Sequence, residues 1–191
     1  MAILSYNEIT QKKVIEYNGE PYEVLSSHVF RMQQRKPVNQ TKLRHLVSGK
    51  VTEISFHQSE TVAEAEIDHI NAQYLYTNRG ESWFAEEGNP KNRFTFPEDA
   101  VADKVKWLIP NSTVEVMTYK EKPATVEIPI KMDLKVVEAP PSVKGDTATG
   151  GDKRVVLESG AAVTTPLFIN EGDVIRINTD TGEYVERVNK A

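Results

Sequence analysis

The sequence has no cysteine, which excludes disulfides, thiol catalysis and cysteine-bound zinc. It also lacks any run of about 18 apolar residues, so no segment is predicted to cross a membrane as a helix. The first residues, from Met1 to Glu8, have neither the basic flank nor the apolar stretch of a signal peptide. We therefore expect a cytoplasmic protein that does not contact membranes.

Sequence patterns of catalysis are absent as well. No two of the four histidines have the i, i+4 spacing of a helical metal pair, and neither a Gly-x-Ser-x-Gly motif nor a phosphate-cradling glycine loop occurs. Adjacent acids such as Glu86 and Glu87 favour a solvated surface over a general acid–base pair. We predict that the protein is not an enzyme and holds no metal and no cofactor.

Acidic residues are missing from one stretch, Val24 to Thr52, although the whole chain has a net charge of −5. A basic region on an otherwise acidic body can direct one end of a protein to phosphate. The alternative is chance clustering on a solvated face. The basic residues of this stretch are Arg31, Arg35, Lys36, Lys42, Arg44 and Lys50.

Short runs of β-branched and aromatic residues, separated by frequent turn signals, predict an all-β chain. Asn18-Gly19 is a strong hairpin signal because both residues tolerate positive φ. The predicted strands are Val14–Tyr17, Tyr22–Leu25, Lys42–Leu46, Val51–Phe56, Ala63–Ile67, Gln73–Tyr76, Ser82–Phe84, Thr113–Tyr119, Ala124–Ile128, Asp173–Asn178 and Glu183–Val188.

One segment has helical spacing instead. From Pro97 to Leu108 the apolar positions recur every three or four residues, and Glu98 and Asp99 suit the positive end of a helix dipole. Composition shifts near residues 65 and 128 predict three domains, 1–64, 65–127 and 128–191, each about the size of a minimal β-barrel.

Two loops are candidates for function. Residues 30–40 form a polar, basic connection between strands, whose amides and cations suit ribose and phosphate; an ordinary solvated hairpin tip is the alternative. The segment Pro140 to Gly151 has glycines that permit close backbone approach and polar side chains that suit sugars or base edges. A flexible connection is the alternative there.

Several motifs, in order along the whole chain, resemble elongation factor P. They are Asn18-Gly19-Glu20-Pro21-Tyr22-Glu23-Val24, Lys42-Leu43-Arg44-His45-Leu46-Val47-Ser48-Gly49, Tyr74-Leu75-Tyr76 with Trp83-Phe84, Lys106-Trp107-Leu108, Pro141-Ser142-Val143-Lys144-Gly145-Asp146-Thr147-Ala148, Pro166-Leu167-Phe168-Ile169-Asn170-Glu171-Gly172-Asp173-Val174-Ile175 and Thr181-Gly182-Glu183-Tyr184-Val185-Glu186-Arg187-Val188.

The resemblance implies an SH3-like (KOW-type) domain followed by two OB-type domains, in an L shape similar to tRNA. It implies a monomer that binds the 70S ribosome between the peptidyl-tRNA and exit sites and promotes peptide-bond formation on ribosomes stalled at consecutive prolines. The implied partners are peptidyl-tRNA carrying proline, ribosomal RNA, and mRNA in the exit site. The factor would act by positioning while the ribosome performs the chemistry.

The resemblance also implies which residues touch RNA. A loop tip faces peptidyl-tRNA, and it is supported by basic residues on the following strands. A second contact lies in the exit site. The tip residues are Arg31, Met32, Gln33, Gln34, Arg35, Lys36 and Pro37, the supporting residues are Lys42, Arg44 and Lys50, and the exit-site residues are Gly145, Asp146, Thr147, Tyr184 and Arg187.

One position departs from the family pattern. Gln34 stands where the family usually carries a lysine or arginine that receives a long post-translational extension. We expect the usual modification to be absent; the alternative is modification of a nearby basic residue. Two other functions remain open: a paralogue with a different ribosomal role, and a general single-stranded nucleic-acid binder built from OB folds.

Overall fold

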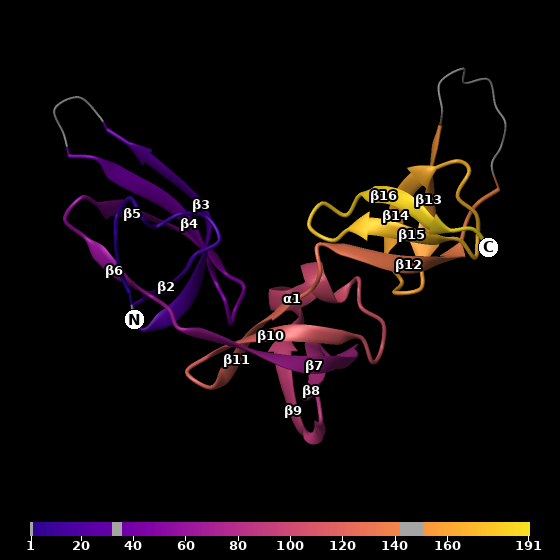
Figure 1. Ribbon diagram of the computed structural model, residues 1–191, viewed down its shortest axis with the longest axis horizontal. Coiled ribbons are helices and arrows are strands. Elements are labelled where there is room, and N and C mark those ends of the chain that lie inside the picture. Colours follow the sequence, from indigo (N-terminus) through magenta and orange to yellow (C-terminus); the bar gives the residue numbers. More distant parts are fainter. Residues whose placement is uncertain (1, 32–35, 142–150) are drawn as a thin grey trace. The chain divides into compact units, whose positions relative to one another are not determined.

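The computed structural model describes residues 2–31, 36–141 and 151–191, and most of these residues are in strands (Figure 1). The strands form three antiparallel sheets of six, five and five strands. The described ranges contain one α-helix. The prediction of an all-β chain with three small barrel-like sheets is therefore confirmed.

The first sheet has the strand order β1-β6-β2-β3-β4-β5. Side chains alternate between the two faces of a strand, and one face of each strand builds the core. Buried core residues include Ile15, Val24, Leu43 and Phe56. The strand bounds are β1 Ile3–Ser5, β2 Val14–Tyr17, β3 Glu20–Phe30, β4 Val38–His45, β5 Val51–His57 and β6 Thr61–Glu64.

The predicted Asn-Gly hairpin joins β2 to β3. Asn18 and Gly19 have φ values of 53° and 81°, and the flanking residues Tyr17 and Glu20 pair across the turn. Two successive positive φ values give the turn a twist that matches its strands, which is why Asn-Gly is favoured here. This hairpin is confirmed.

The middle sheet has the order β11-β10-β7-β8-β9. The predicted strand Ala63–Ile67 is wrong, because β6 ends at Glu64 and the next strand begins at Ile67. Between them Ala65 is buried, and its N–H donates to the Val14 carbonyl at 3.0 Å. The bounds are β7 Ile67–Asn78, β8 Glu81–Glu86, β9 Asn89–Pro97, β10 Thr113–Tyr119 and β11 Lys122–Glu127.

The predicted helix is present but shorter than expected. Helix α1 spans Glu98–Val105, with Glu98 and Asp99 in its first turn. It ends early because the N–H groups of Trp107 and Leu108 bond three residues back, at 3.1 and 2.9 Å, instead of four. That tighter pattern is typical of a helix terminus.

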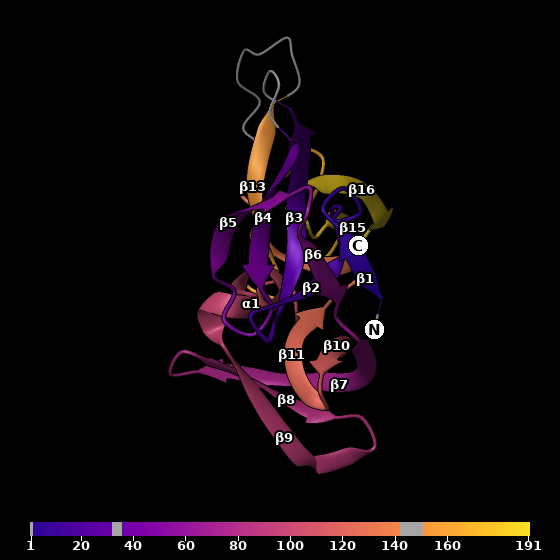
Figure 2. The same cartoon turned by 90° about the vertical axis from the view of Figure 1, so that its left-hand side faces the viewer.

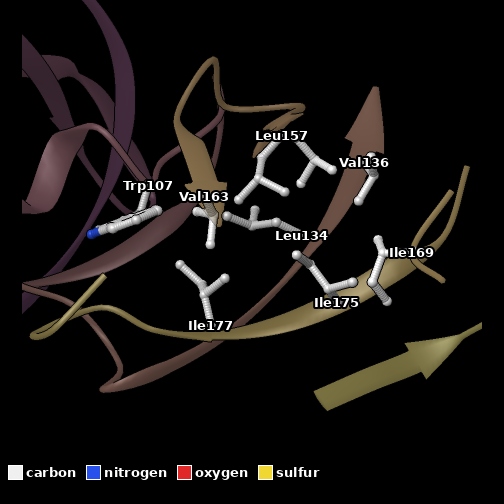
Figure 3. Close-up of a cluster of buried hydrophobic side chains, with 9 residues drawn as sticks. Trp107, Leu134, Val136, Leu157, Val163, Ile169, Ile175 and Ile177 are labelled. Carbon is white, nitrogen blue, oxygen red and sulfur yellow. The ribbon is translucent and has the colours of Figure 1, made fainter. Parts of the chain in front are cut away.

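The third sheet has the order β14-β13-β12-β15-β16. Trp107 belongs to its core, beside Leu134, Val163 and Ile177 (Figure 3). The indole N–H of Trp107 donates to the Thr179 carbonyl at 3.1 Å. The bounds are β12 Lys131–Glu138, β13 Asp152–Leu157, β14 Ala162–Pro166, β15 Val174–Asn178 and β16 Tyr184–Asn189.

The contacts divide the chain into two compact units. One comprises Met1–Val101 and Thr113–Val126, and the other comprises Ala102–Ser112 and Glu127–Ala191. Trp107 therefore lies with the third sheet, whereas the sequence placed it in the middle domain. The three domain boundaries drawn from the sequence remain a prediction.

Candidate functional site

Strands β3 and β4 carry the first candidate site. They run side by side toward the connection 31–37, and β5 pairs with β4 as far as Val38 (Figures 1 and 2). From the buried Val24 to Phe30, the last residue of β3, the strand advances about 20 Å at 3.3 Å per residue. We call the paired strands the β3–β4 arm; Arg31 and Lys36 lie at its end, and beneath it the buried Asn39 donates to the carbonyls of Tyr6 and Ile9 at 2.6 and 2.9 Å.

Only part of the predicted tip can be placed. Arg31 and Lys36 are exposed, and Pro37 is half-buried where it leads into β4. Arg31 also makes an interaction with the rest of the chain. The other predicted tip residues, Met32, Gln33, Gln34 and Arg35, lie outside the described residues.

Two of the supporting basic residues lie on the outer face of β4, and the third lies in the connection to β5. Lys42 is exposed on β4, Arg44 is half-buried on the same face, and Lys50 is exposed just before β5. Lys42 pairs across the strands with Glu53, the first acidic residue after the basic stretch. The folded sheet therefore moderates the positive charge that the sequence stretch suggested.

An aromatic pair near the tip was missed from the sequence. The rings of His28 and Phe30 stack with centroids 6.1 Å apart and an angle of 20°. They share the outer face of β3 because they are two residues apart and lie opposite Gln40 and Val38. Flat faces beside a basic tip suit the stacking of unpaired bases. In the sequence, the available signal was the spacing of His28 and Phe30, because residues two apart in a strand lie on the same face.

The second candidate site lies on the third sheet. Gly145, Asp146 and Thr147 fall outside the described residues. Tyr184, at the start of β16, is half-buried and lines a groove between that strand and β13 and β14. The sequence had not singled out the other polar residues of this groove, which are Asp152, Arg154, Thr164, Thr165 and Glu183.

Arg187 has a different environment from Tyr184, although both belong to β16. Its guanidinium lies 3.4 Å from Asp173 Oδ2 and 5.2 Å from the ring centre of Phe168. Phe168 is 55% exposed. An arginine held over an exposed aromatic ring offers a flat cationic surface. The two predicted exit-site residues thus lie on one strand but contact different neighbours.

Asp173 holds Arg187 in place from a buried position, at 1% exposure. Burial raises the pKa of this carboxyl, but N–H donors from Asn170 and Ala191 and the nearby Arg187 outweigh it, so the pKa is lowered overall. Asp173 is therefore an anion at neutral pH. Charged hydrogen bonds of this kind fix geometry more strongly than neutral ones.

The described residues show no grouping of three metal-binding side chains. Two of the histidines lie beside carboxylates: His45 is 3.5 Å from Glu20, and His69 is 3.7 Å from Glu115. Within the described ranges, no helix is long and apolar enough to cross a membrane.

Comparison with known proteins decides the family. The Elongation factor P (EF-P) KOW-like domain matches residues 5–62, and the Elongation factor P C-terminal domain matches residues 132–187. The elongation factor P of Thermodesulfovibrio yellowstonii is 37% identical over 186 residues, which cover 97% of this chain and 99% of that protein. The chain belongs to the elongation factor P family.

Elongation factor P from Aquifex aeolicus is similarly related, with 34% identity over 98% of this chain and 97% of that protein. As a member of the elongation factor P family, the protein is a translation factor of protein biosynthesis. The KOW-like match covers the first sheet, and the C-terminal match lies within the third.

Among solved structures, a protein titled eukaryotic translation initiation factor 5A from Methanococcus jannaschii is similar with a TM-score of 0.49. The sequence identity is 13%, over 66% of this chain and 94% of that one. A likeness at this level is too low to support an argument.

Proposed function

We propose that this member of the elongation factor P family binds the ribosome between the peptidyl-tRNA and exit sites and promotes peptide-bond formation on ribosomes stalled at consecutive prolines. The observation that supports it best is the basic tip at the end of the β3–β4 arm, in a chain that matches its family over nearly its whole length. A loop at the end of a hairpin can reach phosphates that a broad surface cannot. The protein acts as a cytoplasmic monomer.

The tip contacts peptidyl-tRNA through both charged groups and neutral hydrogen bonds. Arg35 and Lys36 hold the tRNA backbone through charge-assisted bonds to phosphate. Gln33 and Gln34 offer neutral hydrogen bonds near the acceptor end of peptidyl-tRNA. Pro37 fixes φ at one side of the loop and reduces the entropy lost on docking.

Translation of a polyproline reporter tests these roles. Lys36→Ala and Arg35→Ala weaken ribosome binding, whereas Gln34→Ala lowers the rate of peptide-bond formation more than it lowers affinity. Lys91→Ala is the matched control, because it removes the same charge from an exposed position on β9 of the middle sheet. Equal losses in Lys36→Ala and Lys91→Ala would contradict a specific role for the tip.

Salt dependence measures the phosphate contacts directly. Removal of one cation that binds phosphate lowers the slope of log affinity against log salt by about one. Lys42→Ala is expected to reduce that slope, and Lys91→Ala is expected to leave it unchanged. An unchanged slope in Lys42→Ala removes the β4 face from the RNA contact.

The unmodified tip is tested with two preparations of the protein. Intact mass of protein from its natural source shows whether any extension is attached, and recombinant protein of unshifted mass is assayed beside it. We expect equal relief of polyproline stalling. If only native material is active, a modified residue must be sought among Arg31, Arg35 and Lys36.

The exit-site contact involves Asp146 and the groove that contains Tyr184. Asp146 accepts from a base amine or a ribose hydroxyl, because an anion avoids phosphate. Asp146→Ala is expected to weaken stimulation of stalled ribosomes without unfolding the protein. Full activity of this variant, measured beside its unfolding curve, would show that the assignment is wrong.

A second candidate function is a different ribosomal task, favoured by Gln34 at the position where relatives of the family carry the modified residue. Polyproline-independent reporters distinguish the two functions. A protein that binds ribosomes but stimulates only other templates supports this second function. Tight binding to isolated single-stranded RNA would instead indicate a general nucleic-acid binder.

A further inference from the structure

We propose that Gly49, and Tyr119 through its hydrogen bond to Glu16, fix the orientation of the first sheet relative to the middle sheet. Through this orientation they act as positioning residues for the loop tip. This inference rests on the proposed function, because it concerns where the β3–β4 arm delivers its end. The two sheets belong to one compact unit of the chain. The two sheets contact each other at two separate places.

The first contact is a close approach of backbone to backbone. Gly49, between β4 and β5, has a φ of +69°, and a Cβ atom built on it would lie 2.8 Å from Cα of Ala100 in helix α1. Ala100 is buried. The Gly49 N–H donates to the His45 carbonyl at 2.9 Å, which ties this approach to the last residue of β4. Only glycine permits both the conformation and the contact.

The second contact is polar and involves the β10–β11 hairpin. Tyr119 donates its hydroxyl to Glu16 of β2 at 2.5 Å. Lys120 lies 3.5 Å from the same carboxylate and 4.7 Å from the centre of the Tyr119 ring. The hydrogen bond from Tyr119 is the main cause that lowers the pKa of Glu16. Glu16 is therefore ionised at neutral pH and accepts both donors.

Apolar packing adds to the polar contact. Leu46 and Ala65 from the connections of the first sheet form a buried cluster with Tyr119 and Ala124 of the middle sheet. Leu46 follows directly after β4, the strand that leads back to the tip. A buried cluster resists sliding, and two separate contacts resist rotation about either one.

We call the contacts between the first and middle sheets the joint. The length of the arm makes the angle between these two sheets important. From His45 to Val38 the strand β4 spans about 23 Å at 3.3 Å per residue. A rotation of about 10° at the joint would therefore move the end of the arm by roughly 4 Å. Misplacement of reacting groups by about 1 Å can lower a rate about a hundredfold. A loose joint would thus lower the rate of peptide-bond formation even with an unchanged tip.

Gly49→Ala is the decisive variant, and Gly88→Ala is its matched control. Gly88 has a φ of +79° with nothing within 4 Å of the added Cβ, so its alanine variant has similar backbone strain without a contact to disturb. We expect Gly49→Ala to lower the rate on polyproline templates about tenfold at saturating factor. Gly88→Ala should retain the wild-type rate.

The joint is measured on the free protein by the distance between two spin labels. The chain has no cysteine, so Ser59→Cys, exposed in the turn between β5 and β6, and Thr113→Cys, exposed at the start of β10, give two unique attachment sites. We expect one narrow distance distribution in wild type, a shifted or broadened one in Gly49→Ala, and an unchanged one in Gly88→Ala. Identical distributions in all three proteins would overturn the proposal.

Tyr119→Phe provides a milder second test, because it removes only the hydroxyl that contacts Glu16. We expect a broader distance distribution and a partial loss of rate, with ribosome affinity within about twofold of wild type. A loss of rate with an unchanged distance distribution would refute the proposal that Tyr119 fixes the orientation of the two sheets. If wild type itself fails to relieve stalling, the proposed function fails, and the distance measurements still decide whether the joint is fixed.

Discussion

At the residue scale, Asp173 shows how a buried charge organises one end of the third sheet. It accepts N–H groups from Asn170 and Ala191, each at 2.9 Å, and lies beside Arg187. These partners offset the cost of burying the carboxylate. Because the pKa of Asp173 is lowered in the folded protein, its ionised form stabilises the fold above the ordinary aspartate pKa of about 3.9.

We predict that Asp173→Asn lowers the free energy of unfolding by about 2 kcal/mol at pH 7. The contribution of Asp173 is lost as the pH falls through its lowered folded pKa, so the difference between the two proteins should shrink as the pH falls below the ordinary aspartate pKa of about 3.9. Urea unfolding at pH 7 and at acidic pH measures this. Asp180→Asn, at an exposed position, is the control and should change neither value. A pH-independent difference would contradict the role of the charge.

At the element scale, the β10–β11 turn has an unusual sequence for its geometry. Lys120 and Glu121 both have positive φ, 49° and 63°, whereas the β2–β3 turn meets the same demand with Asn18 and Gly19. Left-handed backbone costs ordinary residues about 1–2 kcal/mol each. The contacts of Lys120 with Glu16 and Tyr119 help to offset this cost.

Glu121→Gly is therefore expected to raise the free energy of unfolding by about 0.5–1 kcal/mol, because relief of the left-handed strain exceeds the added chain entropy of glycine. Denaturant unfolding of the two proteins checks the sign. Glu115→Gly, in the interior of β10, should instead lose about 1 kcal/mol, since no positive φ is relieved there. A loss of stability in Glu121→Gly would show that the turn is not strained.

Interactions between neighbours in the chain explain which elements could be predicted from the sequence. The Asn18-Gly19 hairpin and the helix with acidic residues in its first turn depend on neighbours in the chain, so local patterns predicted them. The strand Ala63–Ile67 was wrong because its pattern continues where the chain passes from one sheet to the next. Only the burial of Ala65 against Tyr119 and Ala124 explains the break.

At the scale of the whole molecule, Trp107 packs in the C-terminal unit a few residues after the chain leaves the first unit. It is 2% exposed in the core of the third sheet, although helix α1 directly before it starts in the first unit. Its partners Leu134 and Ile177 are distant in sequence. The segment Ala102–Ser112, which contains Trp107, belongs to the C-terminal unit.

Trp107→Ala is predicted to destabilise the C-terminal unit by about 3–5 kcal/mol and to leave the first unit nearly unchanged. Hydrogen exchange resolved by peptide measures both units in one experiment. Val116→Ala, in the core of the middle sheet, should produce the reverse pattern with a smaller loss. Equal destabilisation of both units by either substitution would mean that they unfold together.

The sequence predicted some residues of the candidate sites and missed others, for a physical reason. The resemblance along the chain named the tip, the supporting basic residues and the exit-site residues, and it still provides the only assignment of Gln34 and Asp146. The groove residue Arg154 and the stacked pair His28 and Phe30 were missed. The groove partners of Arg154 come from other strands, so no local pattern indicates them. His28 and Phe30 are two residues apart on one strand, and their spacing was the signal that the prediction did not use.

The sequence by itself determined the family, the all-β class, the Asn18-Gly19 hairpin and the concentration of basic residues before Thr52, because each depends on residue identity or on near neighbours. Tertiary structure alone decided that Glu53 lies beside Lys42, that Trp107 packs in the third sheet and that Gly49 contacts Ala100. Contacts between residues far apart in the chain depend on how whole sheets pack, and packing is a property of the folded chain.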